Sequence, residues 1–317
     1  MRILKPLVLA LSLSVLALQA PRANAEASLA GLNTDGTLFT ISSTGVLTQK
    51  AAEPLTSYTL GAVARKGNNF YYIATPSGAA ENALYKASLS SGVISHVDLD
   101  LATGDDSAKA LFFSGKKLFG LFYNSNTGNG GIYKINQKTG ATSLLVDFSS
   151  LDIEPIGGAI ARQAGFYYVL GHPSSDSTVR SLVRFKLKRG SATSFAITTK
   201  AGAPVVCDRI KLNKVRQDFV CLASPSTSQV DVCRLSTKGK AKCLSTLTNV
   251  QRIAGGHTMV TPDGKNFYAF VYAPGDENSQ RLIRFSAGGG VKTTQTINTI
   301  IIGARFGEED ADEATPS

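Results

Sequence analysis

The sequence predicts an all-β protein, and three observations indicate a six-bladed β-propeller. Five aromatic-rich segments recur along the chain at intervals of 48, 48, 53 and 48 residues. A second apolar run and then a glycine follow each segment, so that every repeat contains a strand, a turn and another strand. The composition, with 30 glycines and only 18% charged residues, argues against a helical bundle. Four-strand units of this length are typical of propeller blades.

Each repeat has the same order of parts. The aromatic segments begin at Phe70, Leu118, Phe166, Phe219 and Phe267. The second runs begin at Leu84, Ile132, Leu182, Val232 and Leu282, and the glycines that follow are Gly92, Gly140, Gly190, Gly239 and Gly290. Strands rich in small residues, such as Gly61–Arg65 and Gly158–Arg162, precede the aromatic segments. Small residues suit an innermost strand, because the inner strands of all blades converge on one axis.

A sixth copy near the start of the chain lacks an inner strand. It consists of Ser28–Leu32 and the run at Leu38. The segment Ile300–Arg305 resembles the inner strand that begins at Tyr58, and a ring closed in this way leaves no open sheet edge. We therefore predict a six-bladed propeller over residues 26–306, with blade 1 closed by N-terminal strands plus a C-terminal inner strand. Five or seven blades, or a pair of β-sandwiches, are the alternatives.

The two ends of the chain are predicted to lie outside the propeller. Residues 1–25 carry Arg2 and Lys5, an apolar run and a small-residue end at Ala25, which is the pattern of a secretory signal peptide. The run is too short for a membrane anchor. We expect an exported protein, periplasmic or extracellular, with no transmembrane anchor in the mature chain. Residues 307–317 carry five acids within 308–313, and we predict a disordered acidic tail.

Four cysteines fall within 37 residues of the fifth repeat: Cys207, Cys221, Cys233 and Cys243. An exported chain permits disulfides, and the spacing lacks the close pairs typical of zinc sites. Each of the pairs Cys207–Cys221 and Cys233–Cys243 lies on two predicted strands joined by one turn. We therefore predict these two disulfides, with Cys221–Cys233 as the closest rival pairing.

One turn suggests a relationship. The segment Thr261-Pro-Asp-Gly-Lys265, which precedes Phe267, resembles the turn of TolB-type blades. The chain is therefore similar to the broad superfamily of six-bladed propellers of the TolB and NHL kind. The resemblance covers the architecture and no functional motif. The Glu-Gly-Pro start typical of the metal-binding gluconolactonase and regucalcin branch has no match in this sequence.

Charged residues are distributed unevenly on the propeller template. Turns between first and second strands, and between third and fourth strands, lie on one side of the disc, which we call the upper face. Between Arg180 and Lys242 there are 14 Lys and Arg against three Asp. The predicted polyanion-binding residues are Lys188, Arg189, Lys211, Lys214, Arg216, Lys238 and Lys240. Clustered positive charge attracts polyanions. We expect no specific nucleic-acid binding, because no aromatic residues alternate with these turns to stack on bases.

The opposite side, the lower face, is predicted to be acidic. Four residues there are candidate ligands for Ca²⁺ or Mg²⁺ at the channel mouth: Asp105, Asp106, Glu154 and His257. The sequence contains no serine-hydrolase elbow, zinc-protease or phosphate-loop motif. It therefore favours a monomeric, non-enzymatic binding or scaffold module with a protein or polyanionic glycan partner. The alternative is a metal-dependent hydrolase or lactonase.

Overall fold

The computed structural model describes residues 29–42, 44–77, 82–101, 107–188, 190, 192–226, 228–247, 250, 259–260, 266–273 and 275–306. The predicted signal peptide, the acidic tail and the Thr261–Lys265 turn lie outside the described residues. Apart from the 3₁₀ turn η1 (Ser149–Leu151), the described elements are all β-strands. None of the described segments forms a helix with the length and apolar character needed to span a bilayer.

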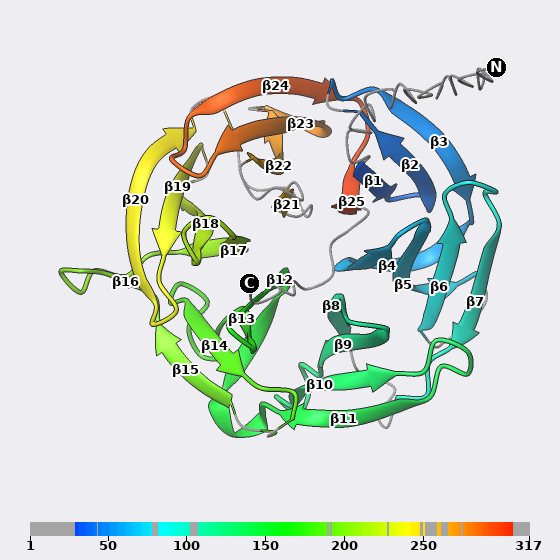
Figure 1. Ribbon diagram of the computed structural model, residues 1–317, viewed down its shortest axis with the longest axis horizontal. Helices are drawn as coiled ribbons and strands as arrows, with labels where there is room; N and C mark the ends of the chain where they lie inside the picture. Colours follow the sequence, from blue (N-terminus) through cyan, green and yellow to red (C-terminus); the bar gives the residue numbers. More distant parts are fainter. Residues whose placement is uncertain are drawn as a thin grey trace, which may run out of the picture.

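Six sheets surround a central axis, which confirms the predicted six-bladed propeller (Figure 1). From the axis outward, blade 1 consists of β25 (Ile301–Phe306), β1 (Leu29–Asn33), β2 (Thr37–Ile41) and β3 (Leu47–Ala52). Blade 2 consists of β4 (Leu55–Lys66), β5 (Asn69–Pro76), β6 (Ala83–Ser88) and β7 (Ile94–Asp98). Blade 3 consists of β8 (Ser107–Ser114), β9 (Lys117–Tyr123), β10 (Gly130–Ile135) and β11 (Thr142–Asp147).

The remaining blades follow the same order. Blade 4 consists of β12 (Ile153–Gln163), β13 (Phe166–Pro173), β14 (Ser181–Phe185) and β15 (Ala192–Ala196). Blade 5 consists of β17 (Cys207–Asn213), β18 (Asp218–Ser226), β19 (Gln229–Leu235) and β20 (Lys240–Leu247), with β16 (Thr198–Thr199) added to its outer edge. Blade 6 consists of β21 (Met259–Val260), β22 (Asn266–Ala273), β23 (Asp276–Ser286) and β24 (Val291–Ile297).

The burial of each strand, and therefore its content of apolar residues, depends on its distance from the axis. Second strands such as β5 are covered on both faces by neighbouring blades and are buried over five consecutive residues. Fourth strands such as β7 lie at the rim, have no buried residue and are mostly exposed. The apolar core is divided among the junctions between blades; Tyr71 and Ile73 of blade 2, for example, pack with Phe113 and Leu118 of blade 3.

In blade 1, β25 pairs antiparallel with β1, so that Phe306 lies opposite Leu29. The inner strands of blades 3 and 5 contain register breaks, at Ala108/Ala110 and at Cys207/Arg209. The residues within these breaks are Lys109 and Asp208. Such β-bulges redirect a side chain and are frequent beside functional sites.

A glycine in the turn between the third and fourth strands packs against the preceding blade. Gly140 has φ +72°, and a Cβ added there would clash with the carbonyl of Asp98 in blade 2. Gly239 has φ +77°, and a Cβ there would clash with the carbonyl of Ala196 in blade 4. Equivalent contacts to the preceding blade occur at Gly45, Gly92, Gly190 and Gly289. In blade 6 this role belongs to Gly289, one residue before the glycine in the predicted repeat.

The strand register corrects one alignment of the repeats. Tyr167 pairs with Phe185 as Phe70 pairs with Ala87 and Phe219 with Leu235. The residue equivalent to Phe70 in blade 4 is therefore Tyr167, not Phe166. Phe166 lies one residue earlier, at the first position of β13 beside the upper turn. Residue types alone misplaced it, because Phe166, Tyr167 and Tyr168 are all aromatic.

Candidate functional site

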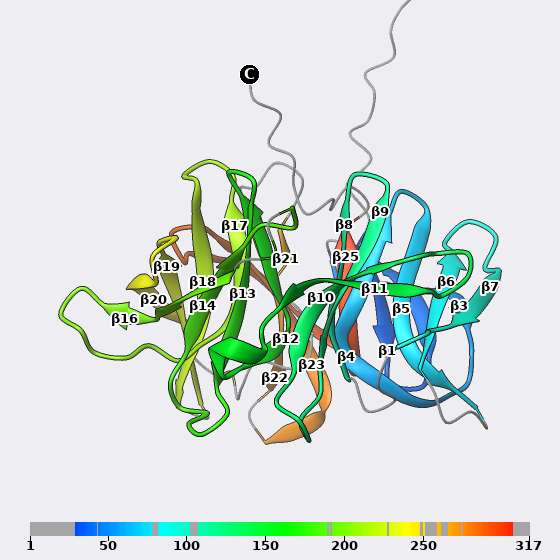
Figure 2. The ribbon, with the colours of Figure 1, turned by 90° about the horizontal axis from the view of Figure 1, so that it is seen from below.

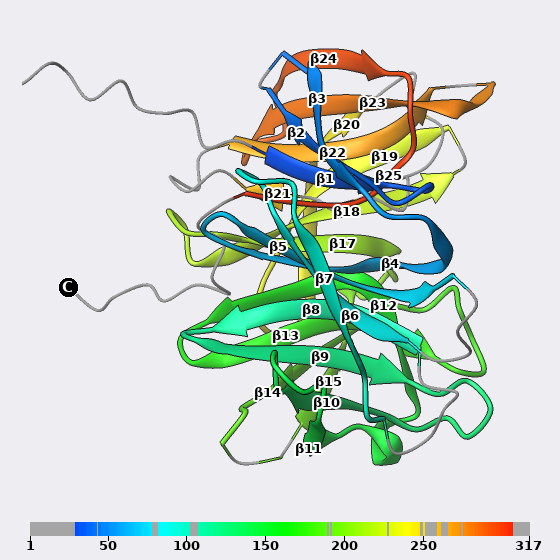
Figure 3. The same ribbon diagram turned by 90° about the vertical axis from the view of Figure 1, so that its right-hand side faces the viewer.

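The predicted polyanion-binding residues lie on turns of blades 4 and 5. Lys188 lies in the β14–β15 turn, Lys214 and Arg216 in the β17–β18 turn, and Lys238 in the β19–β20 turn. Lys188, Arg216 and Lys238 are exposed, and Lys214 is half-buried. The views from the side show that these turns belong to one side of the disc (Figures 2 and 3). Arg189 lies outside the described residues.

The other two predicted residues are held more firmly. Lys211 lies within β17 and is half-buried. The Lys240 ammonium donates a hydrogen bond to Thr198 Oγ1 at 2.9 Å, which ties the first residue of β20 to the edge strand β16. The six described residues of this set therefore belong to one region of the molecule, and Lys211 and Lys240 are more restrained than the turn residues.

A pair of cations that the sequence analysis did not select lies in blade 4. The Arg184 guanidinium lies 4.7 Å from the centroid of the Phe166 ring and 5.2 Å from that of Phe195. The Lys186 ammonium lies 4.3 Å from the centroid of the same Phe166 ring. Both aromatic rings are half-buried. Cations near ring faces gain about 0.5–1 kcal/mol at exposed sites. Aromatic residues are thus present beside the basic turns, where they support cations.

Tyr168 lies on the strand next to this pair of cations. It is 3% exposed and lies opposite Arg184 in the pairing of β13 with β14. Burial raises the pKa of Tyr168, and the charge of Arg184 opposes that shift. Thr237 belongs to the β19–β20 turn of blade 5, whose Gly239 packs against Phe195 and Ala196. The basic turn of blade 5 therefore packs against the outer strand of blade 4, which carries Phe195.

The corresponding arginine of blade 5 has a carboxylate partner. Asp218 opens β18 as Phe166 opens β13, and Arg234 occupies the place of Arg184. The Arg234 guanidinium donates from Nε to Asp218 Oδ2 at 2.6 Å. When the repeats are aligned so that Tyr167 matches Phe219, Phe166 falls at the position of Asp218. An alignment by strand register would therefore have found this difference in the sequence.

The predicted metal site is only partly described. Asp105, Asp106 and His257 lie outside the described residues. Glu154 lies on β12, and its Oε1 is 3.4 Å from Nζ of Lys109, the bulged residue of β8. Within the described part of the chain, no three His, Cys, Asp or Glu side chains are grouped as metal ligands. The Ca²⁺ or Mg²⁺ site therefore stays a prediction.

Other acids of the lower face stabilise loops. Hydrogen bonds from the Thr178 side chain and backbone lower the pKa of Asp176, and those from Ser279 and Asn278 lower the pKa of Asp276. Such Asp side chains fix turns by bonding to residues two or three positions later.

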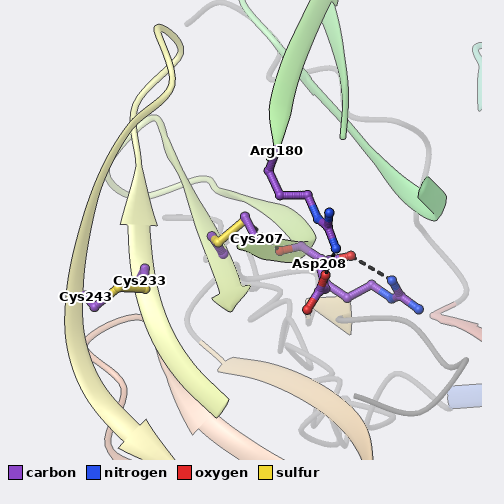
Figure 4. The surroundings of a disulfide bond; sticks show 7 residues. Arg180, Cys207, Asp208, Cys233 and Cys243 are labelled. Carbon is purple, nitrogen blue, oxygen red and sulfur yellow. Dashed lines mark hydrogen bonds and ion pairs between the residues drawn. A yellow bond between two sulfur atoms is a disulfide. The ribbon is translucent and has the colours of Figure 1, made fainter. Parts of the chain in front are cut away.

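Both predicted disulfides are present in blade 5 (Figure 4). Cys207 is bonded to Cys221, and Cys233 is bonded to Cys243. The rival pair Cys221 and Cys233 is also directly opposed across β18 and β19, so the register alone would permit it. Close to Cys207, Arg180 of blade 4 reaches across to Asp208, with Nη2 2.9 Å from Oδ1 (Figure 4).

The disulfide row replaces side-chain packing found in blade 2. There, Tyr72 lies opposite Tyr85, and Tyr85 lies opposite His96. Tyr72 and Tyr85 are stacked at 4.8 Å, and the rings of Tyr85 and His96 are 5.0 Å apart. Blade 5 has cysteines at the three equivalent places, and the Cys233–Cys243 bond joins the third and fourth strands where the Tyr85–His96 contact joins them in blade 2.

Comparison with known proteins identifies the architecture. No family model matches the chain, and a search of curated proteins found no match. Among solved structures, TolB from Acinetobacter baumannii is similar with a TM-score of 0.59 and 16% identity, over 88% of this chain and 64% of that one. A putative 6-phosphogluconolactonase from Bacteroides uniformis gives 0.56 and 13%, over 88% and 98%. One from Bacteroides fragilis gives 0.55 and 11%, over 90% and 99%.

These likenesses show the fold alone. The chain is a six-bladed propeller, as its sequence predicts, and its fold is similar to that of TolB. The chain spans about two thirds of the length of the TolB structure it matches. Propellers carry unrelated activities, so a functional conclusion must come from the residues of the site.

Proposed function

We propose that this protein is an exported, non-enzymatic binding module whose upper face binds polyanions such as acidic glycans. The observation that carries the proposal is the set of exposed cations on adjacent turns of blades 4 and 5. On this part of the upper face, Arg234 forms an ion pair with Asp218. The exposed Lys188, Arg216 and Lys238 and the half-buried Lys214 thus add their charges to a common field.

Export is supported by the disulfides and by the signal-like pattern of residues 1–25. Disulfides persist in oxidising compartments and are rare in the cytosol. Outside the cell, the abundant polyanions are acidic polysaccharides and lipid-linked glycans, which present repeated negative groups to a flat, rigid surface. A propeller disc closed by antiparallel strand pairing provides such a surface.

Heparin chromatography tests the proposal, with heparin as the probe polyanion. The test variant is Lys188→Ser/Lys214→Ser/Lys238→Ser, and the matched control is Lys50→Ser/Lys86→Ser/Lys200→Ser, which removes the same charge from other regions. Counterion release predicts that the slope of log affinity against log salt falls by about three in the test variant. Equal elution of the two variants would refute the proposal.

A further inference from the structure

Blade 4 departs from the repeat at the first residue of its second strand. In blades 2, 3, 5 and 6 this position is polar: Asn69, Lys117, Asp218 and Asn266. Each of the last two has a cationic partner, because Asp218 pairs with Arg234 and Asn266 Oδ1 accepts a hydrogen bond from Lys292 at 2.9 Å. Blade 4 has Phe166 instead. Arg184 therefore meets an aromatic ring where the arginine of blade 5 meets a carboxylate.

The second departure is at the end of the third strand. The other five blades have a serine or asparagine there, whose side chain accepts a hydrogen bond from the following turn. These residues are Ser42, Ser88, Asn136, Ser236 and Ser286, with N···O distances of 3.0 to 3.3 Å to the amides of Val46, Ser91, Lys138, Lys240 and Gly290. Blade 4 has Lys186, which provides no acceptor for its own turn.

Together the two departures place like charges on one ring, with no ion-pair partner among the described residues. Arg184 and Lys186 both lie within 5 Å of the Phe166 centroid, and neither is among the ion pairs formed by the described residues. Phe166 attracts both cations but cancels neither charge. Where a chain breaks its own local rule without a structural gain, a functional role is the expected reason.

We propose that Arg184 and Lys186 form a discrete subsite for one oxyanion group, sulfate or phosphate, of the polyanion. This inference rests on the proposed function and makes it more specific. The guanidinium presents paired N–H donors in a fixed plane, which suits oxyanion oxygens, and the ammonium adds a compact charge. Phe166 and Phe195 hold the guanidinium in place before the anion arrives, so less side-chain freedom is lost on binding.

Titration with inorganic sulfate, in place of chloride at constant ionic strength, tests the subsite. The measurements are isothermal calorimetry and thermal unfolding. We expect saturable binding to the unmodified protein and at least about tenfold weaker binding to Arg184→Gln and to Lys186→Ser, as for loss of a charge-assisted bond. The control is Lys134→Gln, which removes one exposed cation from the equivalent position of blade 3. It should bind sulfate as tightly as the unmodified protein.

Further arms identify the source and separate the two proposals. Inorganic phosphate should bind comparably to sulfate, and acetate more weakly. No saturable sulfate binding, or equal loss in Lys134→Gln and Arg184→Gln, would overturn the subsite. Retained heparin binding with that result would leave the proposed function standing. Circular dichroism of each variant verifies that it is folded.

Discussion

Blades 4 and 5 share one template and use it differently. Arg184 and Arg234 occupy the same place on their third strands, but Phe166 lies beside the first and Asp218 beside the second. The carboxylate closes one arginine into an internal ion pair, whereas the ring leaves the charge of the other available to a ligand. Under our proposal, one residue beside a repeated cation thus determines whether that cation forms an internal ion pair or binds a ligand.

The two blades also differ in the residues that lie opposite one another across their second, third and fourth strands. In blade 4, Val169 lies opposite Val183, and Val183 lies opposite Ser194. In blade 5 the three equivalent places hold cysteines, of which Cys233 and Cys243 are bonded to each other. Blade 5 therefore carries covalent reinforcement directly beside the blade on which we place the ligand.

The largest expected effect comes from removing that reinforcement. Cys207→Ala/Cys221→Ala should lower the free energy of unfolding by about 3 kcal/mol, because the bond closes a loop of 14 residues. Urea unfolding measures the change. Cys233→Ala/Cys243→Ala removes a bond that closes a shorter loop, of 10 residues. It should therefore lower the free energy of unfolding by slightly less. Loss of under 0.5 kcal/mol for both pairs would show that the sheet holds without them.

Exchanging the distinguishing residues tests the comparison directly. Phe166→Asp should give Arg184 an internal carboxylate and weaken sulfate binding about tenfold, equivalent to about 1.4 kcal/mol. Asp218→Phe/Ser236→Lys should give blade 5 the arrangement of blade 4 and raise the calorimetric stoichiometry from one sulfate to two. An unchanged stoichiometry would show that the two residues are insufficient to make a site.

A smaller effect is expected from the acidic tail. Phe306 pairs with Leu29, so β25 ends on the upper face, and five acids lie within residues 308–313. A tethered segment competes at an effective concentration in the millimolar range, so a chain ending at Phe306 should bind heparin about threefold more tightly at low salt. The difference should vanish near 1 M salt. Equal low-salt affinities would exclude screening by the tail.

The smallest expected effect is that of Lys186→Ser, which should stabilise the fold and weaken sulfate binding. Lys186→Ser restores the turn acceptor found in the other five blades and should raise the free energy of unfolding by about 0.5 kcal/mol, the lower value for one hydrogen bond. The same variant should lose sulfate affinity. A variant that loses both stability and affinity would indicate that Lys186 supports the fold.

The sequence predicted the six blades and the cysteine pairs because each depends on spacing. Regular intervals survive small errors in strand boundaries, and a cysteine pair needs only two adjacent strands joined by one turn. The Arg184 and Lys186 pair depends on register to a single residue. Three consecutive aromatic residues, Phe166, Tyr167 and Tyr168, obscured that register, since any of them fits the repeat.

The exposure of some predicted polyanion-binding residues could be expected for a similar reason. Turn lysines such as Lys188 and Lys238 are identified by composition, and their exposure follows from the turn. Whether a cation such as Arg184 or Arg234 has a carboxylate partner depends on which side chains meet across the strands. Composition contains no such information, so Lys109 was not recognised as the partner of Glu154.

The glycine contacts between blades all run in one direction around the disc. Each turn rests on the outer strand of the blade before it, including the contact of Gly45 in blade 1 with Gln295 in blade 6. The overlaps therefore form a closed cycle with no terminal member, and opening any junction requires movement of the blades on both sides. Amide hydrogens of the rim strands should consequently exchange at similar rates in the five blades that lack an added edge strand, although these strands are mostly exposed.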